Sequence, residues 1–301
     1  MPSLMAARPF PLSISIISCN EEVNLERCLR SAADLAREIV VVDSGSTDGT
    51  PDMVEAEFPE VRLIRLGNVG FSAANNAVLM DSGRGNGPRM FLLLNPDTEV
   101  REGTIDAAIS RLDRSPEVGM VGVRLVTADG TFDHASKRAF PTPLAALAHF
   151  TGIGRLPGAP DSLTQYRATW LGENEAGPVE AVNGAFMLVR REAADQVGPL
   201  DEGYWLYMED LDWCRRFGEA GWTVFYEPAG EALHVKGGSS PARRRPRQEI
   251  AFHRGMGRFY RRFDAPGNPS LVNFAVYLGI AAKLAVSLLI TALSPGPGKR
   301  G

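Results

Sequence analysis

Short apolar runs alternate with segments of helical periodicity along the first third of the chain. Such runs are typical of buried strands, and apolar residues at every third or fourth position are typical of a helix with one buried face. The pattern predicts strands at residues 12–18, 38–42, 61–66 and 90–94, and helices at residues 22–36, 51–58 and 72–80. This alternation favours an α/β fold, with a mostly parallel mixed sheet flanked by helices.

The second half of the chain has a less regular pattern. It predicts strands at residues 118–126, 185–190 and 223–226, and helices at residues 192–197 and 248–263. Residues 140–177 are rich in Pro and Gly, and we interpret them as an irregular, mobile substrate loop. We predict a main domain at residues 1–240, with a first half at about 12–100 and a second half at about 101–240, followed by an extension at 241–301.

Polar clusters follow three of the predicted strands where each strand ends. Because the carboxyl ends of parallel strands meet at one edge of a sheet, ligands of such folds bind there. The chain has no G-x-G-x-x-G or P-loop motif near its first strand, so a nucleotide would be held by other side chains. The candidates at this edge are Asn20 and Glu21, Asp43 and Ser44, and Asn95 with Asp97.

Two acids at this edge suit particular parts of a nucleotide. Asp43 can accept from the N3–H of uracil or thymine or from a ribose hydroxyl, and the alternative is an Asx turn or a helix cap. Asp97 can hold Mg²⁺ or Mn²⁺, which would bridge a diphosphate, and the alternative is a plain Asn-Pro-Asp turn. His234 either completes a metal shell, contacts phosphate beside Lys236 and two glycines, or is structural.

The acidic pair Glu209-Asp210 opens a predicted helix whose approach is crowded with aromatic residues. The positive end of the helix dipole favours ionised carboxylates, which suits a general base. The alternative is a charge cluster that only stabilises the helix.

The helical repeat separates the two acids of this pair. Glu209 lies about 100° from Asp210 around the helix. The face of Asp210 also carries an apolar row, Trp213, Cys214 and Phe217. Because this row should turn inward, Asp210 is expected at the edge of the core. Asp212 and Arg216 are expected to pair on the helix surface.

Composition narrows the compartment and the partners. The chain has 301 residues and three cysteines without a C-x-x-C pair, and we expect no signal peptide. We predict a reduced, cytoplasmic protein without a cysteine metal site. No nucleic-acid partner is predicted, and the pattern does not define an oligomeric state. Residues 236–262 contain nine Lys or Arg and one acid, Glu249, which suits an anionic membrane surface; the alternative is a solvated linker.

The apolar segment at residues 271–293 is long enough to span a bilayer. Lys283 lies in its middle, where burial in lipid costs roughly 2.5–3.5 kcal/mol or more. A polar stripe runs along one third of the predicted helix and consists of Asn273, Tyr277, Lys283, Ser287 and Thr291. A helix at the membrane interface, on the inner face of the cell membrane, fits this pattern best. A spanning helix and an ordinary buried helix stay open.

Taken in order, these motifs resemble family 2 glycosyltransferases with the GT-A fold. The resemblance covers about residues 12–240 and rests on the segments 15–21, 41–50, 68–75, 94–97, 182–185 and 209–210, followed by His234. The Asn-Pro-Asp motif, together with residues 184–191 and 209–216, is most similar to the WbbL-type rhamnosyltransferases of bacterial cell-wall and polysaccharide assembly.

The resemblance implies inverting transfer from a nucleotide sugar, foremost L-rhamnose from dTDP-L-rhamnose. The acceptor would be a glycan or a polyprenyl-diphosphate-linked glycan. A UDP-hexose donor is the alternative within the class, and a non-catalytic carbohydrate-binding or scaffold protein is the alternative outside it. Asp210 would deprotonate the acceptor hydroxyl beside Glu209, and Asp43 would contact the base.

The resemblance also implies a nucleotide-binding half at about residues 12–100 and an acceptor half at about 101–240, and it assigns the remaining site residues. Asp97 would hold a divalent metal, Mg²⁺ or Mn²⁺, with His234 near the metal or the diphosphate. Asn75 would lie beside the nucleotide, and the acceptor contacts would be Asn183, Gly184 and Trp205. Asn95 stands where the family usually has the first Asp of Asp-X-Asp. Because Asn is a neutral ligand, we expect weaker metal binding and a metal dependence that is not strict.

Overall fold

The computed structural model describes residues 10–81, 87–142, 167–235 and 246–293. The strands of its main sheet are β1 (Phe10–Ser18), β2 (Ala36–Ser44), β3 (Arg62–Leu66), β4 (Met90–Leu94), β5 (Thr98–Val100), β6 (Val118–Val126), β8 (Gly177–Pro178), β10 (Phe186–Arg190) and β11 (Thr223–His234). Their order is β3-β2-β1-β4-β10-β6-β11-β5, with β8 beside β11. A second, small sheet pairs β7 (Lys137–Arg138) with β9 (Ala181–Val182).

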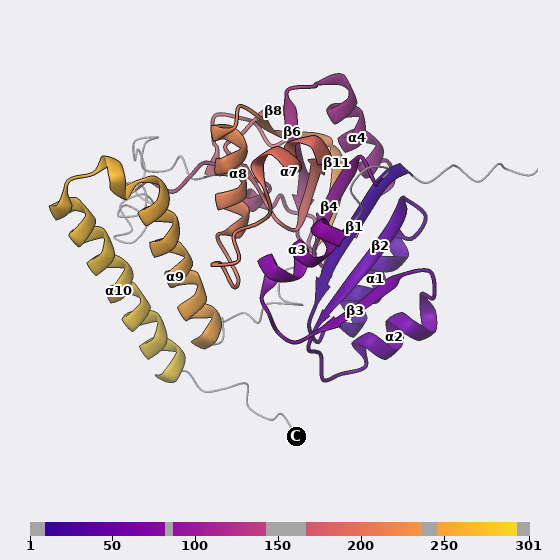
Figure 1. Cartoon of the computed structure of the whole chain (residues 1–301), viewed down its shortest axis with the longest axis horizontal. Helices are drawn as coiled ribbons and strands as arrows, with labels where there is room; N and C mark the ends of the chain where they lie inside the picture. The colour runs from indigo at the N-terminus through magenta and orange to yellow at the C-terminus, as the bar shows by residue number, and fades with distance from the viewer. Residues whose placement is uncertain (1–9, 82–86, 143–166, 236–245, 294–301) are drawn as a thin grey trace, which may run out of the picture.

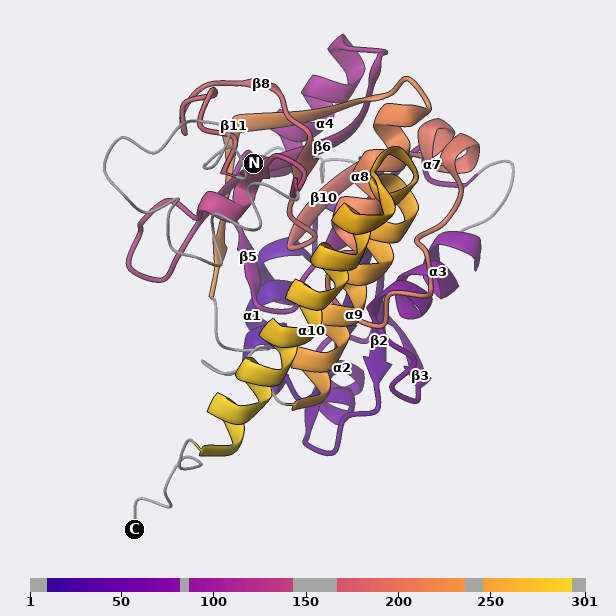
Figure 2. The same ribbon diagram turned by 90° about the vertical axis from the view of Figure 1, so that its left-hand side faces the viewer.

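Helices lie on both faces of this sheet (Figure 1). They are α1 (Glu22–Ala32), α2 (Thr50–Glu57), α3 (Phe71–Asp81), α4 (Thr104–Arg114), α7 (Arg191–Val197) and α8 (Glu209–Glu219). Two further helices, α9 (Pro246–Phe263) and α10 (Ser270–Leu293), form an antiparallel pair outside the sheet, with α9 nearer to α8 (Figures 1 and 2). Short 3₁₀ turns lie at His134–Ser136 and Ala265–Gly267.

The predicted mixed α/β architecture is confirmed. Strands β3, β2, β1 and β4 are parallel, β10 runs antiparallel to β4 and β6, and β6 is parallel to β11. The sequence pattern missed β5 and α4, and it ended β11 at residue 226 instead of His234. A register shift between Glu227 and Glu231 interrupts the pairing of β11, which explains why its apolar alternation stops early.

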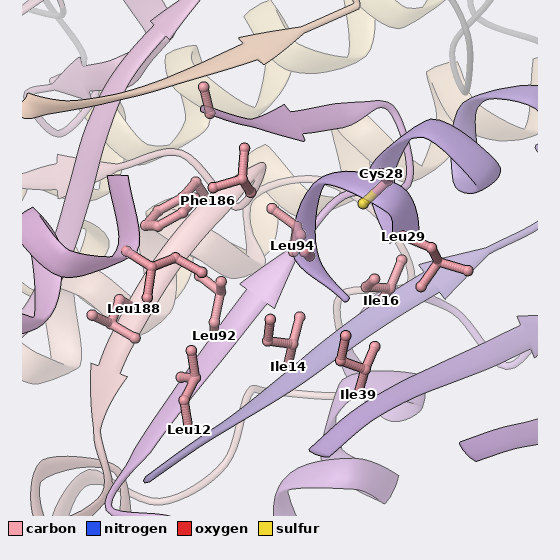
Figure 3. Packing of buried hydrophobic residues seen from close by; sticks show 14 of the residues in the cluster. Leu12, Ile14, Ile16, Cys28, Leu29, Ile39, Leu92, Leu94, Phe186 and Leu188 are labelled. Atoms are coloured by element: carbon pink, nitrogen blue, oxygen red, sulfur yellow. The ribbon is translucent and has the colours of Figure 1, made fainter. Parts of the chain in front are cut away.

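The central strands are buried on both faces, which explains their uninterrupted apolar sequences. On one face, Ile14 and Ile16 of β1 pack with Leu92 and Leu94 of β4 and with α1 (Figure 3). On the other face, the alternate residues of β2 and β4, among them Val42, pack beneath α3 and α8. The core therefore holds the carboxyl ends of β1, β2 and β4 side by side.

Helix α10 packs along α9 through part of its surface. The Tyr260 hydroxyl donates to Asn273 Oδ1 at 2.6 Å, and the Tyr260 ring meets that of Tyr277 edge to face at 5.6 Å. The predicted polar stripe lies on this side: Lys283, Ser287 and Thr291 are half-buried, as is Asn273. The opposite side is apolar and exposed. An 18-residue window of this 24-residue helix has a mean hydropathy of 2.0, so the helix is long and apolar enough to cross a membrane.

Candidate active site

The carboxyl ends of β1 and β2 are connected by hydrogen bonds between backbone amides and side-chain oxygens. Ser18 lies beside Asp43 in the parallel register. Asn20, with φ of 58°, donates its amide N–H to Ser46 Oγ at 2.9 Å and accepts from the Thr47 amide at 2.8 Å. The buried Asp43 carboxylate accepts from the Ser46 amide at 3.3 Å. Asp43 thus forms an Asx-type turn at the very edge where nucleotide binding is predicted.

The pairing of β4 with β10 joins the next strand end to the Asn183-Gly184 loop, which is predicted to contact the acceptor. The Asn95 amide donates to the Ala185 carbonyl at 3.1 Å, and Asn183 Oδ1 accepts from the Ala185 amide at 2.8 Å. One residue earlier, the Gly184 amide lies 3.4 Å from Asp210 Oδ2. Asn95, the Asn183-Gly184 loop and Asp210 are therefore neighbours, although they are far apart in the sequence.

Asp97 and His234 meet because β5 and β11 pair behind the Asn-Pro-Asp turn. Val235 donates its amide to the Asp97 carbonyl at 2.9 Å, and His234 Nε2 lies 3.5 Å from Asp97 Oδ1. On the other side of the ring, Nδ1 lies 3.4 Å from Asp133 Oδ2. Burial lowers the pKa of His234, but its hydrogen bonds to Asp133 and Asp97 outweigh that effect and raise it to about 9.

Asp133 is a site residue that the sequence pattern did not identify. It is buried and caps the 3₁₀ turn by accepting from the Ala135 amide at 2.9 Å. It belongs to no recognisable motif and does not follow a predicted strand end. Only the fold, which brings the turn after β6 against the end of β11, places it beside His234.

The Asp97–His234 pair fits a divalent metal as two of several ligands. Carboxylate oxygen and neutral imidazole nitrogen are donor types that Mn²⁺ accepts, and both side chains are buried. Because the pKa of His234 is raised, a bound metal has to displace the proton from its ring. No group of three or more His, Cys, Asp or Glu in the described ranges forms a complete metal site. Diphosphate oxygens and water would have to supply the remaining ligands, as is usual for Mg²⁺.

The acidic pair at the start of α8 contains two unlike carboxylates. Asp210 Oδ2 accepts from Arg138 at 2.5 Å, and the same guanidinium nitrogen donates to the Val182 carbonyl at 2.6 Å. Glu209 is only 6% exposed, and its Oε2 has no hydrogen-bond partner among the described residues. Burial, followed by the negative charge of Asp210, raises the pKa of Glu209 to about 8.

This finding corrects one expectation. The helix dipole was expected to keep both acids ionised, but for Glu209 burial outweighs the dipole. Asp210 remains half-buried at the edge of the core, as its helical phase predicts.

Sequence and structure comparisons identify the family. The chain matches glycosyl transferase family 2 over residues 13–198. It is 34% identical to the N-acetylglucosaminyl-diphospho-decaprenol L-rhamnosyltransferase of Mycobacterium tuberculosis, over 80% of this chain and 81% of the relative. The chain belongs to glycosyltransferase family 2. The predicted resemblance and the assignment as an enzyme are thereby confirmed.

Two further relatives extend the comparison of this glycosyltransferase. A 51-residue stretch, 17% of the chain and 19% of the relative, is 45% identical to rhamnosyltransferase WbbL of Escherichia coli. The structure of a mannosyltransferase from Pyrobaculum calidifontis, in complex with GDP-Man and Mn²⁺, superposes with a TM-score of 0.55 and 18% identity, covering 96% of this chain and 79% of that one. The latter likeness concerns the fold.

Other predicted residues of the glycosyltransferase have structural partners. The Asn75 side chain accepts from Ser15 Oγ at 2.9 Å and donates to the Phe71 carbonyl at 3.0 Å, so its amide bridges α3 and β1. The Trp205 carbonyl accepts from the Phe71 amide at 2.8 Å, which ties the predicted acceptor side to the start of α3. Residues 236–238, expected beside His234, lie outside the described residues, as does most of the predicted loop at 140–177.

The predicted pair of Asp212 and Arg216 forms, at 2.7 Å, but not on the surface. Asp212 is fully buried, because Tyr204 and Arg262 also donate to it and cover it, each at 3.1 Å. The helical pattern could not show this, since both covering residues come from outside α8.

Proposed function

We propose that this glycosyltransferase moves L-rhamnose from dTDP-L-rhamnose, with inversion, to a polyprenyl-diphosphate-linked glycan. The observation that carries the proposal is the β4–β10 pairing, which joins Asn95, two residues before Asp97, to Ala185, the neighbour of Gly184 at Asp210. Inverting transfer needs one base and groups that stabilise the leaving diphosphate. The residues proposed for both tasks lie at one edge of the sheet. The choice of rhamnose and of a lipid-linked acceptor is supported by the relative of 34% identity.

In the proposed reaction Asp210 accepts the proton of the acceptor hydroxyl. The hydroxyl oxygen then bonds to the anomeric carbon of the donor, and the bond from that carbon to the diphosphate oxygen breaks. The nucleotide half, about residues 12–100, would hold the donor through Asn20, Glu21, Asp43, Ser44, Asn75 and Asn95. A divalent ion held by Asp97 and His234 would neutralise charge on the diphosphate.

A donor comparison tests the proposal. Purified enzyme is incubated with GlcNAc-diphospho-polyprenol, Mn²⁺ and either dTDP-L-rhamnose or a UDP-hexose, and the lipid product and released nucleotide are measured. We expect product and dTDP from the first donor. Product from the UDP-hexose alone would favour the alternative donor. Transfer from neither donor would reject the proposed substrates.

Asp133→Asn is expected to weaken Mn²⁺ binding by about ten- to a hundredfold. A carboxylate behind a metal-binding histidine fixes the tautomer and orientation of the ring, and its loss has effects of that size. Binding is measured by titration calorimetry of the enzyme with Mn²⁺ and dTDP, without any turnover. Asp129→Asn is the control, because Asp129 is exposed and bonds to Thr127 and Thr131. Equal Mn²⁺ affinities in the two variants would contradict a role for Asp133.

We also propose that the enzyme binds the inner face of the cell membrane through α10. The exposed apolar residues of this helix include Leu271, Phe274, Leu278 and Leu289. An apolar helix face of this kind gains free energy by entering the headgroup region of a bilayer. The basic segment contributes less than its composition suggests, because Arg258 and Arg262 are paired with Asp201 and Asp212.

Deleting residues 266–301 is therefore expected to release the enzyme from anionic vesicles. The measurement is flotation with vesicles of phosphatidylglycerol and phosphatidylcholine, comparing the full chain with the truncated one. Replacing Phe274 and Leu278 by Ser, which keeps α10 in place, should give partial release. High salt should release the full chain little, since apolar burial is not screened. An unchanged distribution after truncation would rule out α10 as the anchor.

A further inference from the structure

The turn that leads into the acidic pair Glu209-Asp210 has an unusual backbone. Tyr207 and Met208 both have positive φ, 70° and 75°, although neither is glycine. A non-glycine residue in this region is strained and persists only where its surroundings hold it. Met208 directly precedes Glu209, and its carbonyl accepts the Asp212 amide at 2.9 Å. The direction of this turn therefore sets the direction of the first turn of α8.

Helix α9 covers the turn from the outside. The Phe252 ring meets the Tyr207 ring edge to face at 5.9 Å. Gly255 approaches so closely that a Cβ atom there would lie 3.0 Å from the Tyr207 carbonyl oxygen and 3.1 Å from Met208 Cγ. A side chain at position 255 would therefore press on the two strained residues.

Charged contacts fix α9 in this place at both ends. Near its start, the Arg247 guanidinium lies 4.1 Å from the ring centre of Trp205. Near its end, Arg258 donates to both oxygens of Asp201, at 2.8 Å and 3.0 Å. These partners lie in the loop at residues 201–208. Helix α9 therefore holds in place the loop that leads to the acidic pair Glu209-Asp210.

We propose that α9 is a positioning element of the active site, with Gly255 and Phe252 holding the Tyr207–Met208 turn so that Asp210 points at the acceptor. This inference rests on the proposed role of Asp210 as base. Besides connecting the main domain to α10, helix α9 then has a role in positioning the active site. No residue of α9 needs to contact the substrate, because the helix acts through the backbone on which the base is mounted.

The test compares Gly255→Ala with Gly257→Ala on the same helix. Gly257 has no atom within 4 Å of an added Cβ, so both variants gain the same helix propensity but only the first presses on the turn. We expect Gly255→Ala to lower kcat about three- to tenfold, since a misplacement of 1 Å can cost about a hundredfold. Gly257→Ala should leave kcat unchanged. A second pair, Gly255→Val and Gly257→Val, should widen the difference.

Binding and stability separate positioning from damage to the fold. For Gly255→Ala we expect an unchanged dTDP affinity, an unchanged stoichiometry near one nucleotide per chain, and an unchanged acceptor KM. A partly unfolded variant would instead lose stoichiometry in proportion to kcat, and that result would overturn the inference, as would equal kcat values for the two alanine variants. Asp210→Asn is measured alongside: full activity of that variant would reject the proposed base itself, whereas an inactive Asp210→Asn with an unaffected Gly255→Ala would reject only the role of α9.

Discussion

Asp210→Asn is expected to reduce sugar transfer by about a hundred- to ten-thousandfold, the usual contribution of a general base. The affinity for dTDP and for the donor should change little, because Asp210, beside Gly184, is proposed to act on the acceptor and not on the nucleotide. The measurement combines initial rates with lipid-linked acceptor and titration calorimetry with dTDP. The shape of the side chain is kept, so a loss of rate reports the loss of the proton acceptor.

Position and protonation both favour Asp210 over its neighbour as the base. Its Oδ2 faces the Gly184 amide of the acceptor loop, and the Arg138 guanidinium pairs with the same oxygen. Glu209 is buried and, with its pKa raised to about 8, holds a proton at neutral pH. A protonated carboxyl cannot accept the proton of an acceptor hydroxyl.

Three control variants make the result specific. Arg138→Gln retains the base but removes its ionic partner, so it should lose much less activity than Asp210→Asn. The double variant Arg138→Gln/Asp210→Asn should be as inactive as Asp210→Asn, which excludes a simple clash between the Asn amide and the arginine. Asp195→Asn, an exposed acid paired with Arg191, should behave as the wild type. Transfer at a normal rate by Asp210→Asn would require a different base.

The strand ends of the site could be predicted because they follow uninterrupted apolar runs. Each such run must be a strand buried on both faces, so Asp43 and Asp97 had to lie at its carboxyl end. The sequence also placed Asp210 correctly relative to its helix. What it could not supply were neighbours from other elements: Asp133 beside His234, or Arg138 beside Asp210.

The same limit explains the error at Asp212 and an incomplete expectation for the basic segment. A prediction from helical phase assumes that one face of a helix meets the core and the other face meets solvent. On this assumption Asp212 was expected at the surface. In the fold α9 lies over that surface and Arg262 reaches the carboxylate. The basic composition of residues 236–262 indicated an anionic partner outside the protein, yet two of its arginines have partners inside it. Pattern and composition identify elements, but they do not show which elements cover one another.

We expect the second large effect in the pH dependence of the free energy of unfolding, and we assign it to Glu209. A carboxyl whose pKa is about 8 in the fold and 4.5 as the ordinary value keeps its proton in the native state while the unfolded chain loses it. The contribution of Glu209 to the free energy of unfolding is therefore complete below pH 4.5 and is lost as the pH rises towards 8. At about 1.4 kcal/mol for each pKa unit, the loss approaches an upper limit of about 5 kcal/mol.

Glu209→Gln should abolish this part of the pH dependence, because the amide stays neutral at every pH. Urea unfolding at pH 5, 7 and 9 is expected to show the variant gaining stability over the wild type as the pH rises. Other groups also contribute to the slope, since the pKa of Glu21 is raised to about 7 and that of His234 to about 9. The difference between variant and wild type cancels these contributions.

Glu219→Gln is the matched control, because Glu219 lies exposed on the same helix and pairs with Arg215. Its stability difference from the wild type should be small and nearly independent of pH, as is usual for an exposed ion pair. If the free energy of unfolding of Glu209→Gln changed with pH as that of the wild type does, Glu209 would have to be ionised from pH 5 to pH 9. The carboxylate beside Asp210 would then be charged at neutral pH, and protonation could no longer decide which of the two acids serves as the base.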